Sequence, residues 1–118
     1  MNGEVEPQIV EPQILWAAIE DYTGLWEVVW ELVNWLPNSS SDERKRLAQR
    51  IIRKFIARDW VRLYREEGVG EEVRPLSSDE VETEIMRKSN WEEPVGDTPT
   101  IRIGATSKGK AAYKAREV

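Results

Sequence analysis

Residues 41–58 predict a strongly amphipathic helix, and this helix constrains the fold more than any other segment. It opens with a Ser-x-x-Glu capping box, Ser40 to Glu43, in which each side chain satisfies a backbone N–H of the first turn. At about 100° per residue, the apolar side chains share one face: Leu47, Ala48, Ile51, Ile52, Phe55 and Ile56. The opposite face contains no acidic residue and carries Arg46, Gln49, Arg50, Arg53 and Lys54. We expect the apolar face to pack on a core and the basic face to lie free in solvent.

The basic charge of this helix contrasts with the rest of an acidic chain. The 118 residues have a formal net charge of −5. Residues 1–43 contain nine acidic and no basic residues, residues 44–65 nine basic and one acidic, and residues 66–118 twelve acidic and eight basic. Charge is therefore segregated along the chain, with a second basic group between residues 98 and 116.

Two further helices are predicted before residue 40, after an extended N-terminal arm over residues 1–11. The arm is expected because a Glu-Pro-Gln-Ile sequence occurs twice there, and proline disfavours helix at and before its position. A short helix follows from Pro12, and the next, residues 25–36, is apolar on nearly every side. Such a helix must be buried on two sides. The second side is either the intramolecular core or a homodimer interface, for which the candidate residues are Trp26, Trp30 and Val33.

The second half of the chain predicts two strands separated by a long insertion. "WVRLYRE" and "TIRIGAT" alternate and are rich in β-forming residues. About 35 residues separate them, and Ser77 opens a second capping box, which predicts a helix over residues 77–88. The order of elements is thus three helices, a strand, an insertion with its own helix, a second strand and a final helical turn.

The passage "FIARDWVRLYR…IRIGATSKGKAAY" resembles the end of the winged-helix domains of bacterial transcriptional regulators. A helix runs into a strand there, the wing returns, and a Thr-x-x-Gly turn leads into a helix, with Thr106, Gly109 and Tyr113 at the equivalent positions. The resemblance covers residues 12–116. It implies a mainly α fold with a small β-sheet (α+β), a single winged helix-turn-helix domain. Residues 69–100 then form an insertion within the wing, which departs from the short wing of that family.

The resemblance implies a DNA-binding protein, in the form of a small transcriptional regulator. Its recognition helix would be residues 41–58, which enter the major groove of duplex DNA while the wing contacts the backbone. The expected contacts are Arg46, Gln49, Arg50, Arg53 and Lys54 on the helix, and Arg102, Lys108 and Lys110 in the wing. Arginine and glutamine read base edges, and each neutralised phosphate adds salt-dependent affinity.

A second interpretation is a winged-helix protein–protein interaction module that does not bind DNA. A charged helix face is usually only solvated, and here it could instead meet an acidic protein partner. The net negative charge repels DNA at long range. Glu27 and Glu31 on the preceding helix would also oppose phosphate if they point the same way as Arg50.

The residue types that are missing argue against an enzyme. The chain has no cysteine and no histidine, which excludes disulfides, thiolate nucleophiles, Ser-His-Asp triads and the usual zinc sites. No carboxylate pair has the spacing of a catalytic site, and we expect no cofactor and no metal. The first residues carry no basic region and no apolar run reaches the roughly 20 residues of a membrane span, so the expected location is the cytoplasm.

Overall fold

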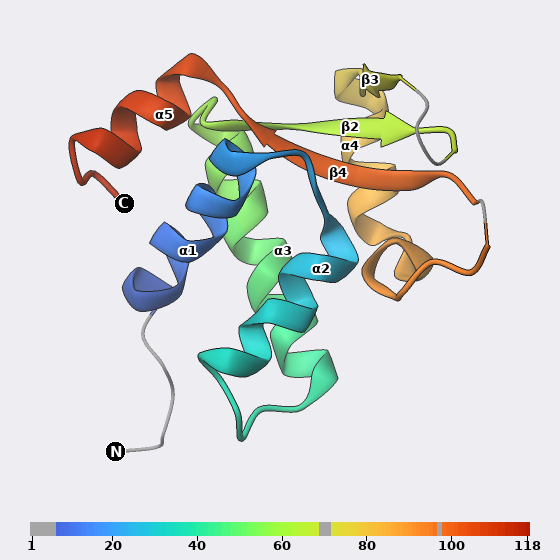
Figure 1. The fold of residues 1–118 in the computed structure, drawn as a ribbon, viewed down its shortest axis with the longest axis horizontal. Coiled ribbons are helices and arrows are strands. Elements are labelled where there is room, and N and C mark those ends of the chain that lie inside the picture. The colour runs from blue at the N-terminus through green and yellow to red at the C-terminus, as the bar shows by residue number, and fades with distance from the viewer. Residues whose placement is uncertain (1–6, 69–71, 97) are drawn as a thin grey trace.

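The computed structural model describes residues 7–68, 72–96 and 98–118, which form five α-helices and a four-stranded antiparallel sheet (Figure 1). The fold class is therefore α+β, as the sequence predicted. The elements of the first half are α1 (Pro7–Glu20), β1 (Thr23–Gly24), α2 (Leu25–Glu31), the 3-10 helix η1 (Leu32–Asn34) and α3 (Ser41–Ala57). Those of the second half are β2 (Val61–Glu66), β3 (Val73–Pro75), α4 (Ser78–Met86), the 3-10 helix η2 (Lys88–Trp91), β4 (Thr100–Ala105) and α5 (Ser107–Lys114).

The two predicted strands are adjacent and form the centre of the sheet. The strand order is β1-β4-β2-β3, and β2 pairs with β4 over six residues, from Val61↔Ala105 to Glu66↔Thr100. β3 adds to the outer edge of β2, and the two-residue β1 adds to the outer edge of β4. In Figure 1 the β2–β4 pair crosses the top of the view, α1 to α3 lie below it, and α4 and α5 lie near opposite ends of the sheet.

Helix α3 has the cap and the buried face that its sequence predicted. The Ser40 side chain accepts a hydrogen bond from the Glu43 backbone N–H, and the Ser40 backbone N–H donates to the Glu43 carboxylate, both at 3.1 Å. The bond from the Ser40 backbone N–H to the carboxylate, followed by the contribution of the Ser40 hydroxyl, lowers the pKa of Glu43. Ala48, Ile51, Ile52 and Phe55 are buried in a core that extends from Val10 to Ala112.

The predicted N-terminal arm is wrong from residue 7 onward. α1 begins at Pro7 and continues through Pro12, while residues 1–6 lie outside the described part of the chain. Pro7 is the first helical residue, a position where the missing N–H costs nothing. Pro12 does remove one helical hydrogen bond, but the helical path places Val10, Ile14 and Leu15 in the core. Burial of these side chains, which contributes about 1.5–3 kcal/mol each, offsets that loss.

The described part of the insertion, residues 72–96 and 98–100, is folded and contributes to the core. Its residues include β3, α4 and η2, of which the sequence predicted only the helix. The Glu80 carboxylate accepts hydrogen bonds from the Arg74 guanidinium and from the Ser77 backbone N–H, and these bonds lower its pKa to about 2. Ile85 is fully buried and Trp91 is 3% exposed, and the indole N–H of Trp91 donates to the Ile85 carbonyl at 2.8 Å. The insertion is therefore fixed to the domain by its own apolar side chains.

Helix α5 lies very close to the start of β2. Thr106 caps it by accepting from the Gly109 N–H, and the Thr106 backbone N–H donates to the carbonyl of Trp60 at 2.9 Å. A Cβ on Gly109 would stand 2.1 Å from the same carbonyl oxygen. Glycine is required at this position because any side chain would collide with the backbone of the neighbouring strand. Within the described residues, every helix is too short or too polar to cross a lipid bilayer.

Candidate interaction surface

The side of α3 predicted to be free is instead contacted by the insertion. Arg53 forms an ion pair with Glu82 of α4, with 2.6 Å between Nη2 and Oε1, and its guanidinium also contacts the sulfur of Met86. The Gln49 amide N–H donates to the carbonyl of Ile85 at 3.4 Å. Two of the five residues expected to contact DNA are thus bonded to α4.

A second carboxylate reaches α3 from the N-terminal helix. The Lys54 ammonium lies 2.9 and 3.0 Å from the two carboxylate oxygens of Glu11. Glu11 is only 8% exposed, so its charge has little access to water and depends on this lysine. Lys54 therefore has a structural role that its position on the solvent side of α3 did not predict.

The expectation of a free basic face is therefore wrong for Gln49, Arg53 and Lys54. Arg46 and Arg50 are exposed, and neither has an ion-pair partner within the described ranges. The physical reason is that acidic side chains distant in sequence fold onto α3, which the local pattern of residues 41–58 does not reveal. Whether Arg46 and Arg50 contact DNA stays a prediction.

The three residues expected in the wing do not extend this surface. Arg102 of β4 lies between two carboxylates, 3.2 Å from Glu66 and 3.6 Å from Glu27, and donates to the carbonyl of Tyr22. Lys108 and Lys110 are exposed on α5, which lies near the opposite end of the sheet from α4 (Figure 1). The basic residues therefore form separate groups. Glu27, which would oppose phosphate only if it pointed the same way as Arg50, has its charge offset by Arg102.

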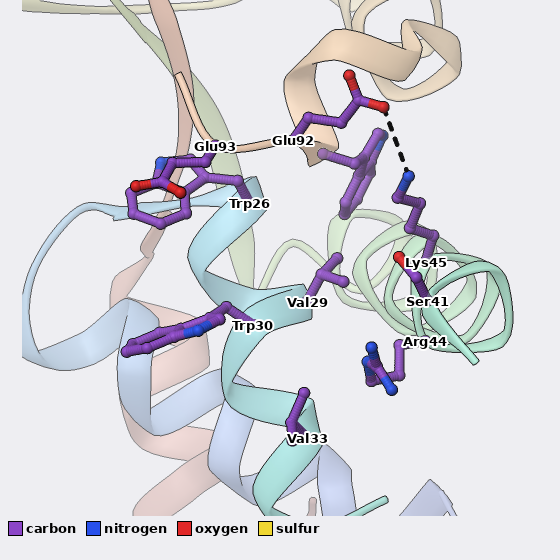
Figure 2. A pocket seen from close by; sticks show the side chains of 10 residues that line it. Trp26, Val29, Trp30, Val33, Ser41, Arg44, Lys45, Glu92 and Glu93 are labelled. Carbon is purple, nitrogen blue, oxygen red and sulfur yellow. Dashed lines mark ion pairs between the residues drawn. The ribbon is translucent and has the colours of Figure 1, made fainter. Parts of the chain in front are cut away.

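A groove lies between α2 and the first turns of α3, and η2 borders it (Figure 2). Its volume is about 580 Å³. The lining side chains are Trp26, Val29, Trp30, Val33, Ser41, Arg44, Lys45, Trp91, Glu92 and Glu93. All three residues predicted for a dimer interface are among them. Trp30 is 70% exposed and Val33 40% exposed, whereas Trp26 is partly buried. Trp30 is the most exposed tryptophan of the chain.

Charged side chains stand at the two ends of this groove. Figure 2 shows Glu93 beside Trp26 at the start of α2, and Arg44 beside Val33 at the other end. At the Glu93 end, on the α3 side, Lys45 forms an ion pair with Glu92 at 3.7 Å (Figure 2). Arg44 is held in place by its Nη1, which donates to the carbonyl of Ser39 at 2.6 Å. The groove therefore has an apolar floor, with Arg44 at one end and, at the other, Glu93 together with the Lys45–Glu92 ion pair.

The sequence predicted the α2 side of this groove but not its other wall. Arg44 and Lys45 belong to the basic segment of residues 44–65, and Glu92 and Glu93 to the insertion of residues 69–100, and nothing in the sequence indicates that these residues meet. The residues that the structure describes contain no group of three or more acidic side chains arranged to hold a metal ion. Comparison of the chain with protein-family models, curated proteins and solved structures finds no match.

Proposed function

We propose that the protein is a winged-helix protein–protein interaction module that does not bind duplex DNA through α3. The winged-helix assignment is supported by the order of elements, in which a third, amphipathic helix is followed by two strands that pair with each other. The interaction role is supported by what covers α3 and by what remains exposed on α2.

The observation that carries the proposal is the contact between α4 and the basic side of α3. Entry of α3 into a major groove requires α4 to move away from Gln49 and Arg53. Such a movement would bring Ile85 and Trp91 out of the core, at a cost of roughly 1.5–3 kcal/mol for each side chain. This cost favours a state in which the insertion covers the basic side of α3.

Electrostatics also disfavours DNA at this surface. Glu11, Glu82 and Glu92 lie within 4 Å of basic side chains on α3 and cancel their charges locally. Counterion release requires lysines and arginines that can neutralise phosphates, and here a phosphate would have to displace a carboxylate that stays nearby. The total charge of −5 adds long-range repulsion.

The exposed side of α2 has the composition of a protein-binding surface. Tryptophan is enriched among the residues that contribute most to protein–protein affinity, because it combines a large apolar area with an N–H donor. Trp30 and Val33 lie exposed beside an apolar groove with a polar rim, and exposed apolar patches of this kind mark interaction sites. This surface carries the interaction that we propose.

DNA binding stays a second candidate, because Arg46, Arg50, Lys108 and Lys110 are exposed. Fluorescence anisotropy of a labelled random DNA duplex, titrated with the protein at low and moderate salt, separates the two functions. The interaction module predicts no binding in either condition. Salt-sensitive binding that is lost in the Arg46→Glu/Arg50→Glu variant would contradict it, and Lys108→Glu/Lys110→Glu serves as the matched control for binding through α5.

A further inference from the structure

We infer that the partner bound at the groove is a second copy of this chain, related by a two-fold axis. The inference rests on the proposed function and names its partner. Trp26, Trp30 and Val33 have the spacing i, i+4, i+7, so they form one stripe along the axis of α2 and η1. Trp30 is the middle member of the stripe and the most exposed. Two such stripes crossing at Trp30 bury both tryptophans near the symmetry axis.

Charge complementarity identifies the second copy as the occupant. A two-fold axis through Trp30 reverses the direction of the groove, so the Arg44 end of one protomer meets the Glu93 end of the other. Each interface then contains this basic–acidic contact twice. Glu93 is exposed and, within the described part of the chain, has no ion-pair partner of its own, which leaves its carboxylate available for this contact.

The size of the surface predicts a weak dimer. The exposed apolar residues that a second copy would cover on this stripe, Trp30 and Val33, are few compared with the roughly 20–30 residues on each side of a standard interface. We therefore expect a rapidly exchanging dimer with a dissociation constant in the micromolar range. Binding of another occupant, such as an acidic protein or an apolar helix from an unrelated chain, would not account for the opposite charges at the two ends of the groove.

Sedimentation velocity of the full chain, at concentrations from about 1 µM to about 1 mM, covers the range of weak association. The wild-type protein is expected to shift from monomer to dimer across this range. Trp30→Ala should raise the dissociation constant by at least about 30-fold, the effect of a central interface tryptophan. Trp16→Ala is the matched control, because Trp16 is likewise an exposed tryptophan (42%) but stacks on Tyr113 of α5 and does not line the groove.

A charge swap tests the two-fold arrangement directly. Arg44→Glu alone places two carboxylates at each contact, and Glu93→Arg alone places two guanidinium groups there, so each variant should dimerise more weakly than wild type. When the two variants are mixed, each of the two contacts in the heterodimer again joins one carboxylate to one guanidinium group. The heterodimer should therefore form with close to wild-type affinity. Rescue on mixing also shows that both variants are folded.

Three results would overturn the inference. These are a wild-type chain that stays monomeric at the highest concentration, a dimer that is unaffected by Trp30→Ala, and charge variants that are not rescued by mixing. If Arg44→Glu fails to fold, Glu93→Arg and Trp30→Ala still decide between the outcomes. The DNA titration tests the proposed function separately. If the protein dimerises and also binds DNA, the proposed function is refuted. If it stays monomeric and does not bind DNA, only the inference of a second copy as partner is refuted.

Discussion

Replacement of Gly109 by alanine tests the close packing of α5 on the sheet. Within a helix this substitution normally stabilises a protein by about 1 kcal/mol, because alanine has the higher helix propensity. Here the new Cβ would stand 2.1 Å from the carbonyl oxygen of Trp60. Real contacts of a Cβ lie beyond 3.0 Å, so α5 has to move by about 1 Å relative to the strand.

The expected effect is a net loss of stability. Overpacking of a well-packed contact costs typically 1–3 kcal/mol, and a contact with backbone belongs at the upper end because it cannot be relieved by a side-chain rotation. The shift also strains the hydrogen bond from the Thr106 N–H to the Trp60 carbonyl. After the propensity gain is subtracted, we expect Gly109→Ala to lower the free energy of unfolding by about 2 kcal/mol, or the Tm by about 8 °C.

Urea denaturation followed by tryptophan fluorescence, together with thermal denaturation followed by circular dichroism, measures this difference. Lys108→Ala is the matched control, since Lys108 is exposed on the same helix and its replacement should change stability by less than about 0.5 kcal/mol. A Gly109→Ala protein as stable as wild type, or more stable, would refute the reasoning, because propensity alone would then decide the result.

Three other outcomes follow from the contacts described above. Ser40→Ala removes the cap of α3 and should cost about 1 kcal/mol of unfolding free energy in urea denaturation. Lys54→Ala leaves the buried Glu11 without its partner. It should destabilise the protein more than Arg53→Ala, which breaks an exposed pair worth roughly 0–1 kcal/mol. Equal effects of the two variants in the same assay would argue against the structural role of Lys54. The folded pKa of Glu80, about 2, lies below its ordinary value of 4.5, so its stabilising contribution is complete above pH 4.5 and is lost as pH falls toward 2. The Tm difference between wild type and Glu80→Gln should accordingly be largest near neutral pH and close to zero at pH 2.

The sequence predicted those helices and strands whose boundaries are marked by residues close to them in the chain. The capping boxes at Ser40 and Ser77 located the starts of α3 and α4, and the alternation of apolar residues located β2 and β4. The start of α1 was missed because the burial of Val10, Ile14 and Leu15 together offsets the cost of Pro12, and burial is a property of the whole fold. β1 and β3 were missed because two or three residues are too few to show a period.

The contacts of the candidate site could not be predicted, because they join residues that are distant in sequence. The basic face of α3 was recognised correctly as a pattern, but its partners Glu82 and Glu11 lie 29 and 43 residues away in sequence. No window of local sequence contains such a pair. For α2, the sequence identified Trp26, Trp30 and Val33 as one side of a helix that is apolar nearly all round, but it left open whether the core or a second copy covers them. In the structure Trp30 and Val33 are exposed.

The pairing of β1 with β4 has a consequence for synthesis of the protein. Thr23 and Gly24 pair with Ile103 and Arg102, which lie about 80 residues later in the sequence. The ribosome needs roughly 4–16 s to synthesise these 80 residues at 5–20 residues per second. Until then α1, α2 and α3 have no complete sheet to pack on, and their apolar faces remain open to other nascent or folded chains. We therefore expect the N-terminal half to bind a holding chaperone during this interval, and synonymous changes that slow translation between residues 24 and 102 should lower the yield of folded protein, measured as the soluble fraction after expression.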